Sequence, residues 1–149
     1  TDYIKRLIGI SGDTIQFVNG KIFINGKTIK RKKINFNHEI RCGSNNLEVD
    51  AYEETLPNGV NYIAVYSKER TMQNTDKYTV PADHYFFLGD NRDCSKDSRF
   101  LSTVGYVKQL NLVGKAKIIF FSNDTAKGSF LKFWNWRNSF RLKRIFKKL

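Results

Sequence analysis

The sequence predicts a mainly β protein built from antiparallel strands. Short stretches of alternating apolar and polar residues are separated by turn signals, and Asn19-Gly20 and Asn25-Gly26 are the dipeptides that two-residue β-hairpins favour. Before residue 128, no stretch keeps the helical spacing of apolar residues for more than a turn or two. With 149 residues, the chain has room for one core that carries a smaller insert.

The expected strands of the core come from both ends of the chain. Residues 3–8, Thr14–Val18 and Lys21–Ile24 are the first three, and Ile15 and Phe17 share one face of the second because side chains alternate along a strand. The apolar run 85–88 predicts a buried strand, and we expect further strands at 104–107 and 115–121. Residues 1–29 and 77–125 are thus predicted to form one discontinuous antiparallel core.

The segment 30–76 differs in composition from its flanks. It begins with four consecutive basic residues at 30–33, which is typical of a solvated face, and it is rich in asparagine. Alternation persists weakly at 34–40 and again at 62–66. We expect residues 30–76 to form an inserted, smaller β lobe.

The last 24 residues hold most of the net charge of +12. From residue 126 onward there are eight basic residues and no acidic one. Leu142, Ile145, Phe146 and Leu149 are spaced as on one face of a helix, so 129–149 is predicted to be an amphipathic helix within the basic tail 126–149. Such a helix suits an anionic membrane surface, which we favour over packing on the core or stacking on nucleic acid.

Cysteine and histidine are too sparse to indicate a metal or cofactor site. Cys42 and Cys94 lie 52 residues apart and match neither a zinc knuckle nor a CxxC redox motif. Two independent thiols are the favoured interpretation, and a disulfide stays open. His38 and His84 are the only histidines, in a polar stretch and beside aromatic residues, which favours a surface or packed imidazole over a catalytic one. The sequence therefore predicts no metal and no cofactor.

Lys5 is the first candidate for chemistry. On a strand it would share a face with Tyr3 and Leu7, and an amine held among apolar groups loses the solvation that stabilises its charged form. A neutral lysine amine can act as a general base. Taken alone, the pattern favours a lysine that extends from a strand into solvent over a general base.

The loop 89–99 is the second candidate. It follows an apolar strand and contains three carboxylates, three cations and two hydroxyls within eleven residues. Loops at strand ends are where a rigid scaffold presents functional groups. A surface loop stabilised by its own Asp–Arg pairs remains an equal alternative from the residues alone.

Both segments resemble motifs of the bacterial type I signal peptidases. Residues 3–13, YIKRLIGISGD, resemble the lysine box of that family, and residues 89–99, GDNRDCSKDSR, resemble its GDNRDxSxDSR box. Residues 81–86 and 112–116 are similar to flanking segments, so the resemblance covers about residues 1–122 apart from the insert. It implies the antiparallel fold shared by signal peptidases and the self-cleaving repressors, and the loop and the inserted lobe favour the signal peptidases.

The resemblance also implies roles for individual residues. Lys5 would be the general base of a Ser–Lys dyad, and Ser95 the hydroxyl that orients its amine. Asp97 and Arg99 would support the site as a charged pair, with Asp90 as a further carboxylate. The residues expected to line the substrate cleft are Asp2, Tyr3 and Ile4.

The implied activity is that of a membrane-associated serine endopeptidase. It would remove signal peptides with the Ala-x-Ala pattern from exported preproteins, at the outer, periplasmic face of the bacterial plasma membrane, without nucleic acid or metal. The family's nucleophile lies in a Ser-Met-x-Pro box, and the single methionine here, Met72, is followed by Gln73. We therefore expect a C-terminal fragment that is inactive by itself. The alternative is a non-catalytic β-rich module bound to a membrane or nucleic acid through 126–149.

Overall fold

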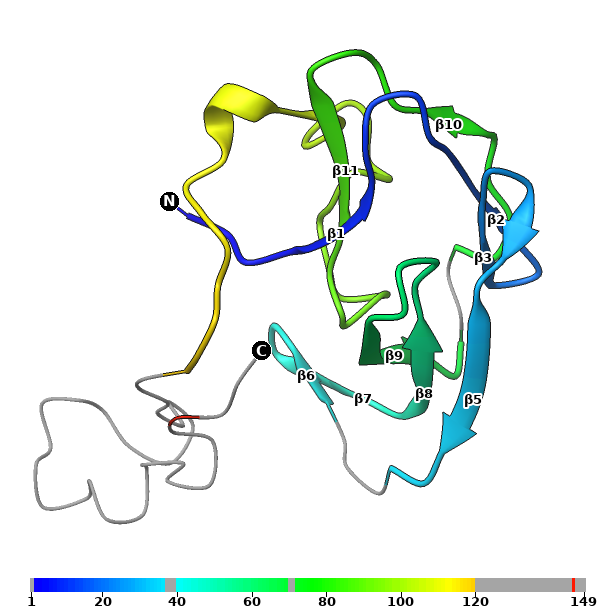
Figure 1. The fold of residues 1–149 in the computed structure, drawn as a ribbon. Helices are drawn as coiled ribbons and strands as arrows, with labels where there is room; N and C mark the ends of the chain where they lie inside the picture. Colours follow the sequence, from blue (N-terminus) through cyan, green and yellow to red (C-terminus); the bar gives the residue numbers. More distant parts are fainter. Residues whose placement is uncertain (1, 37–39, 70–71, 120–145, 147–149) are drawn as a thin grey trace, which may run out of the picture. The chain divides into compact units, whose positions relative to one another are not determined.

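The computed structural model describes residues 2–36, 40–69, 72–119 and 146. It divides into two compact units, Thr1–Leu112 and Val113–Leu149, of which the first carries all the strands named below (Figure 1). The amphipathic helix predicted for 129–149, in the basic tail 126–149, lies outside the described residues, except for Phe146. Within the described part of the chain, no helix has the length and apolar character needed to cross a membrane.

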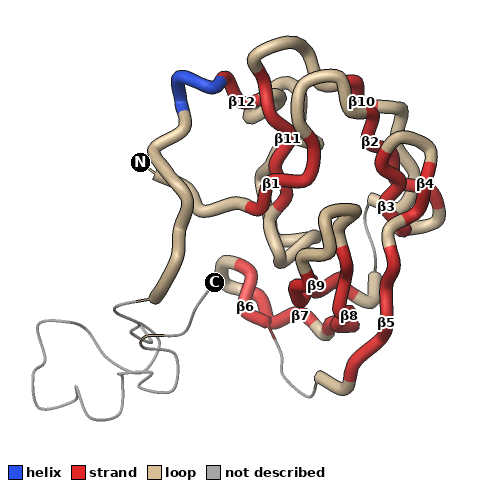
Figure 2. Tube along the Cα trace, in the orientation of Figure 1, coloured by secondary structure: helices blue, strands red, loops and turns tan. Residues whose placement is uncertain are grey.

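Short β-strands make up the first unit, as Figure 2 shows in red. The strands are β1 Arg6–Gly9, β2 Thr14–Val18, β3 Lys21–Ile24, β4 Lys27–Thr28, β5 Lys30–Ile34, β6 Ile40–Cys42, β7 Asn45–Leu47, β8 Val49–Thr55, β9 Asn61–Ser67, β10 Tyr78–Thr79, β11 His84–Leu88 and β12 Val107–Lys108. A 3₁₀ turn, Gln109–Asn111, follows β12.

The strands form small antiparallel sheets. Their orders are β1-β11-β12, β10-β2-β3-β4, β5-β8-β9 and the hairpin β6-β7. Every strand pair is antiparallel, which confirms the predicted fold class. The sheet β5-β8-β9 and the hairpin β6-β7 both fall within the predicted lobe 30–76, whose boundaries stay a prediction.

Both predicted Asn-Gly turns are present. Asn19 and Gly20 have φ values of 48° and 69°, and Asn25 and Gly26 have 52° and 76°, as the type of turn that fits the twist of a hairpin requires. The first turn sets the register of β2 against β3 and places Phe17 opposite Ile22. Both of these side chains are buried.

One hydrophobic core extends across the sheets of the first unit. It is built from β2 and β3, from β1 and β11, and from one face of β8 and β9. Among its largest fully buried apolar side chains are Ile15, Phe17, Ile22, Phe86 and Leu88. A smaller cluster of Val49, Ala51 and Val65 lies under Ile34, Phe36, Ile40 and Leu47. The lobe therefore shares the main core and has a small second one.

Three predicted strands differ from the observed ones. β1 begins at Arg6 and not at residue 3, because its partner β11 ends at Leu88, the residue paired with Arg6. Of 104–107 only Val107 lies in a strand, since the turn after Phe100 includes residue 104. Residues 115–119 form none of the described strands, although Ile118 takes part in a β-bridge, and 120–121 lie outside the described residues. Apolar content thus indicates strand propensity but not where a strand begins or ends.

The preference for two independent thiols was wrong. Cys42 and Cys94 form a disulfide, with their Cα atoms 5.7 Å apart, and no other cysteine exists in the chain. Cys42 ends β6 of the lobe, whereas Cys94 lies in the loop after β11. The pairing could not be read from spacing because it depends on how the lobe folds back against that loop.

Candidate active site

Lys5 and Ser95 lie in direct contact although 90 residues separate them. Lys5 Nζ donates a hydrogen bond to Ser95 Oγ at 2.7 Å. The pairing of β1 with β11 explains the contact, because Lys5 immediately precedes β1 and Ser95 belongs to the loop that follows β11. Ser95 is buried and Lys5 is half-buried. An amine held by one hydroxyl has a defined orientation, as a general base requires.

The shielding of Lys5 differs from the expectation. Tyr3 and Leu7, which alternation places on its side of the strand, are 78% and 41% exposed. Gly89, and not these two residues, lies against the Lys5 amine: a Cβ added to Gly89 would be 2.1 Å from Ser95 Oγ and 3.4 Å from Lys5 Nζ. The backbone at Gly89 therefore lies directly against the Ser95 hydroxyl and the Lys5 amine. A side chain at this position would occupy the space of the Ser95 hydroxyl.

Asp97 and Arg99 form a buried ion pair within the loop. Arg99 Nε donates to Asp97 Oδ1 at 2.7 Å, and Arg99 Nη2 donates to Oδ2 at 2.8 Å. Asp97 Oδ2 also accepts the backbone N–H of Gly89 at 3.0 Å, and Arg99 Nη2 donates to the carbonyl of Arg92. A bidentate pair of this kind fixes geometry as well as neutralising charge, so the loop is held internally on both sides of Ser95.

Asp90 forms a bidentate ion pair with Arg6, the residue after Lys5. Arg6 Nε and Nη2 donate to the two carboxylate oxygens at 2.7 and 2.8 Å. The hydrogen bonds from Arg6 to Asp90 raise the pKa of the guanidinium, although partial burial opposes this effect. The Arg6 guanidinium also lies 4.2 Å from the centre of the Tyr62 ring. The pair thereby ties the start of β1 to the start of the loop.

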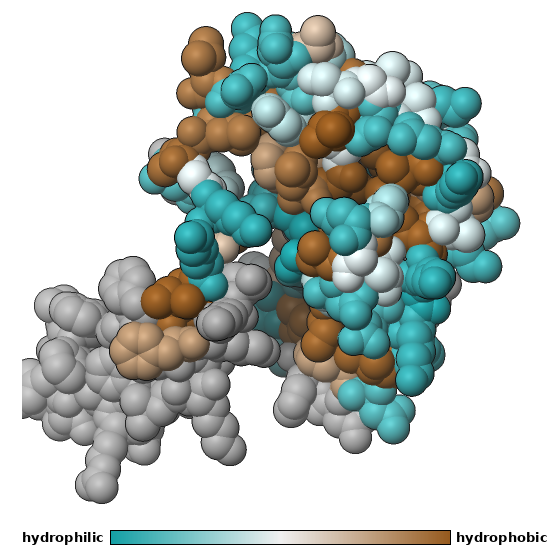
Figure 3. All heavy atoms as spheres, viewed as in Figure 1, coloured by the Kyte–Doolittle hydropathy of each residue, from teal (hydrophilic) through white to brown (hydrophobic). Residues whose placement is uncertain are grey.

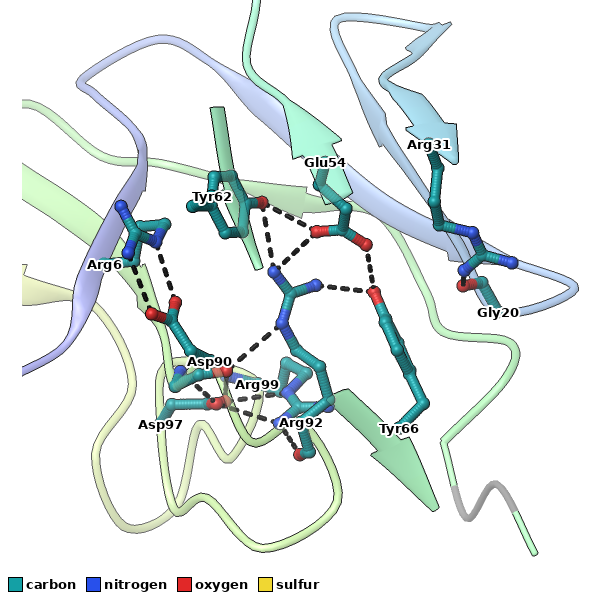
Figure 4. Close-up of polar contacts among 11 residues, drawn as sticks. Arg6, Gly20, Arg31, Glu54, Tyr62, Tyr66, Asp90, Arg92, Asp97 and Arg99 are labelled. Atoms are coloured by element: carbon teal, nitrogen blue, oxygen red, sulfur yellow. Dashed lines mark hydrogen bonds and ion pairs between the residues drawn. The ribbon is translucent and has the colours of Figure 1, made fainter. Parts of the chain in front are cut away.

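A buried network around Arg92 and Glu54 was not predicted as part of the site. Both side chains are fully buried, and Arg92 Nη2 donates to Glu54 Oε2 at 2.8 Å. Tyr62 and Tyr66 donate to the two Glu54 oxygens at 2.8 and 2.6 Å. Burial raises the pKa of both tyrosines, so each keeps the proton that it donates (Figure 4).

The sequence holds only a partial signal for this network. Tyr62 and Tyr66 are four residues apart and therefore lie on the same face of β9, which the sequence does indicate. Glu54, however, meets Tyr62 only through the register of β8 against β9. No local pattern around Glu54 distinguishes it from its exposed neighbour Glu53.

Asp2, Tyr3 and Ile4 form an exposed segment ahead of β1. Tyr3 and Ile4 are each 78% exposed, and Ile10 at the other end of β1 is 52% exposed. Among the described strands β1 pairs only with β11, so its other edge has no strand beside it. Figure 3 shows apolar residues gathered on the face where β1 and β11 lie. An open edge next to apolar side chains can accept an extended peptide.

The groups that could hold a metal do not converge. Over the described ranges, no three side chains of His, Cys, Asp or Glu come together in a way that could bind an ion. His84 Nδ1 lies 2.7 Å from the carbonyl oxygen of Ala82, and His38 lies outside the described residues.

Comparison with known proteins agrees with the resemblance carried by the two motifs. The family model for signal peptidase, peptidase S26, matches residues 1–121. Signal peptidase I of Rickettsia typhi and that of Rickettsia prowazekii are each 40% identical over 99% of this chain. The chain spans 59% of the length of these two curated relatives.

A solved signal peptidase I from Enterococcus faecalis is also similar. It is 27% identical, with a TM-score of 0.38 over 74% of this chain and 78% of that one. The family model and the curated relatives do not support the alternative of a non-catalytic module. The family match over residues 1–121 and the identity to curated relatives show that the chain belongs to the signal peptidase family, peptidase S26.

Proposed function

We propose that the protein removes N-terminal signal peptides from exported preproteins as a serine endopeptidase, with Lys5 as its general base. The observation that carries this proposal is the 2.7 Å hydrogen bond from Lys5 Nζ to Ser95 Oγ, beside an open strand edge. Family membership supports the same reaction class.

The geometry around Lys5 suits proton transfer. When the amine is neutral, one N–H is engaged by Ser95, and the lone pair is free to take the proton of an attacking hydroxyl. The resulting ammonium can return that proton to the leaving amine after the peptide carbonyl is attacked. Ser95 is buried and serves as the hydrogen-bond partner of the amine. The attacking serine belongs to the family's Ser-Met-x-Pro box, which these 149 residues do not contain.

The charged pairs of the loop would hold this arrangement in place. Asp97 and Arg99 support the loop from within, and Asp90 ties it to the residue that follows Lys5. None of these three touches the reacting atoms in the proposal. They fix the distance between a base on one segment and its orienting hydroxyl on another.

The substrate would bind as an added strand. Asp2, Tyr3 and Ile4 offer exposed backbone ahead of β1, and an extended peptide can pair with such an edge. Small pockets next to the dyad would then select the small side chains of an Ala-x-Ala cleavage pattern.

The disulfide supports a location outside the cytoplasm. Structural disulfides persist in oxidising compartments such as the bacterial periplasm. We place the catalytic part at the outer face of the plasma membrane, with the basic segment 126–149 on an anionic membrane surface. No nucleic-acid partner is expected.

Cleavage of a preprotein by the full-length protein tests the proposal. Full-length protein in detergent is incubated with a preprotein that carries an Ala-x-Ala site, and the products are identified by mass spectrometry. Cleavage after the second alanine is expected from the unmodified protein and from Lys21→Ala, which changes an exposed lysine on β3. Lys5→Ala should give no detectable product. Cleavage by Lys5→Ala would refute the proposal, and cleavage by the 149 residues alone would refute the expected external serine.

A further inference from the structure

The ion pair between Glu54 and Arg92 is fully buried, and a buried ion pair is a weak source of stability. Both side chains have 0% of their surface exposed. Removing two charges from water costs several kcal/mol for each ion, and a well-packed apolar pair is often as stable or more so. Apolar residues cannot make hydrogen bonds that fix the orientation of their neighbours. Every polar group of this pair makes such a bond.

Arg92 connects the lobe to Gly89, the residue whose backbone lies against Ser95 and Lys5. Its Nη2 and Nη1 donate to Glu54 on β8 and to the Tyr66 hydroxyl on β9, at 2.8 and 2.7 Å. Its Nε donates to the carbonyl of Gly89 at 3.1 Å. Figure 4 shows the guanidinium facing the Glu54 carboxylate and the hydroxyls of the two tyrosines.

Gly89 is held from both of its peptide groups. Its carbonyl accepts the bond from Arg92, and its N–H donates to Asp97 at 3.0 Å. Since Gly89 abuts the Ser95 hydroxyl, a rotation of its carbonyl would move the surface against which Ser95 and Lys5 meet. Hydrogen bonds from Arg92 to Glu54 and to Gly89 therefore link Glu54 to that surface.

Further bonds attach the lobe to the same loop. The N–H of Val65 on β9 donates to the Asp90 carbonyl at 2.8 Å, and the N–H of Arg92 donates to the Val65 carbonyl at 2.9 Å. The N–H of Ser67 donates to Asp93 Oδ2 at 2.8 Å. The lobe is thus hydrogen-bonded to residues 90–93 of the loop. Arg92 lies at the centre of this attachment, and the Glu54 carboxylate supplies the charge that holds it there.

We propose that Glu54 is a positioning residue for the dyad, acting through Arg92 on Gly89 and thereby on Ser95 and Lys5. This inference rests on the proposed function and adds that the inserted lobe sets the geometry of the base. Glu54 does not touch the substrate, so its loss should lower kcat and leave KM unchanged.

Kinetics of Glu54→Gln in the full-length protein test this role. The substitution keeps the shape of the side chain and removes the charge that holds Arg92. We expect kcat for preprotein cleavage to fall about tenfold, because small displacements at a catalytic centre are costly. The matched control is Val49→Ala, which removes a buried contact from the same strand without touching Arg92. It should lower the thermal midpoint and leave kcat near that of the unmodified protein.

A double-variant cycle tests the route through Arg92. If Glu54 acts through Arg92, then Glu54→Gln combined with Arg92→Lys should be about as slow as the slower single variant. If the double variant instead loses kcat by the product of the two single losses, the two residues act independently and the route through Arg92 is overturned. A kcat of Glu54→Gln equal to that of Val49→Ala would overturn the positioning role.

Two further comparisons keep the test decisive. If Glu54→Gln does not fold, Tyr66→Phe removes one partner from both Glu54 and Arg92, and a kcat no lower than that of Val49→Ala would refute the inference. If Lys5→Ala is inactive but Glu54→Gln has the kcat of the Val49→Ala control, this inference is overturned and the proposed function stands. An active Lys5→Ala would overturn both.

Discussion

Gly89 and Ser95 are in such close contact that no side chain fits at position 89. A Cβ there would lie 2.1 Å from Ser95 Oγ and 2.4 Å from Ser95 Cβ. Gly89→Ala should therefore displace the loop and lower the free energy of unfolding by about 1–3 kcal/mol, the usual cost of overpacking. Urea unfolding measures this change, and Gly114→Ala is the control because nothing lies within 4 Å of its added Cβ. Equal effects of the two substitutions would contradict the close contact.

Ser95→Ala should slow the proposed cleavage without abolishing it. In the proposed mechanism the hydroxyl orients the Lys5 amine, so loss of their hydrogen bond should raise the activation free energy by about 1–3 kcal/mol. Initial rates of preprotein cleavage by the full-length protein measure the effect. Ser102→Ala, on an exposed turn of the same unit, is the control. Unchanged kinetics in Ser95→Ala would show that the hydroxyl has no orienting role.

The local features of the fold were predictable from residue patterns alone, whereas contacts between distant segments were not and needed either a family resemblance or the structure. The Asn19-Gly20 turn requires only that two successive residues adopt positive φ, which asparagine and glycine do readily. The Cys42–Cys94 disulfide depends on where a hairpin of the lobe meets a loop 52 residues away. No local pattern encodes that meeting.

The candidate site shows the same division. The resemblance of two long, specific motifs predicts that Lys5 and Ser95 lie together, and the structure has them in contact, while their roles stay a prediction. Glu54 belongs to neither motif, and only the register of β8 against β9 brings it to Arg92. The support of the site by the lobe therefore needed the three-dimensional structure.

The disulfide should contribute strongly to stability. Its closure of a 52-residue separation corresponds to about 4 kcal/mol in the chain-entropy description of a cross-linked unfolded state. A reducing agent should lower the urea midpoint of the unmodified protein towards that of the variant with both cysteines changed to alanine. That variant should not respond to the reducing agent. An unmodified protein with the same midpoint in both conditions would contradict this expectation.

Stability should fall at alkaline pH because of Tyr62 and Tyr66. Burial is the main cause that raises the pKa of both hydroxyls, so the folded state keeps protons that the unfolded chain releases near pH 10. Above about pH 10 the unfolded state binds fewer protons than the folded one, and the free energy of unfolding decreases as pH rises. Below that pH the two states hold the same tyrosine protons, and this contribution is constant.

Chemical unfolding between about pH 8 and pH 11 measures the decrease. Replacing Tyr62 and Tyr66 by phenylalanine should flatten the slope above pH 10. Tyr3→Phe, which changes a side chain that is 78% exposed, should leave the slope as it is. A slope that is the same in all three proteins would show that the buried hydroxyls do not govern the alkaline loss of stability.

The most direct test of the central claim is the kcat of Lys5→Arg in the full-length protein. Arginine keeps a positive charge and hydrogen-bond donors at this position, but it does not give up a proton at neutral pH. If Lys5 acts as the general base, Lys5→Arg should be as inactive towards a preprotein as Lys5→Ala. Turnover by Lys5→Arg within about tenfold of the unmodified enzyme would mean that charge alone suffices, and would contradict the account.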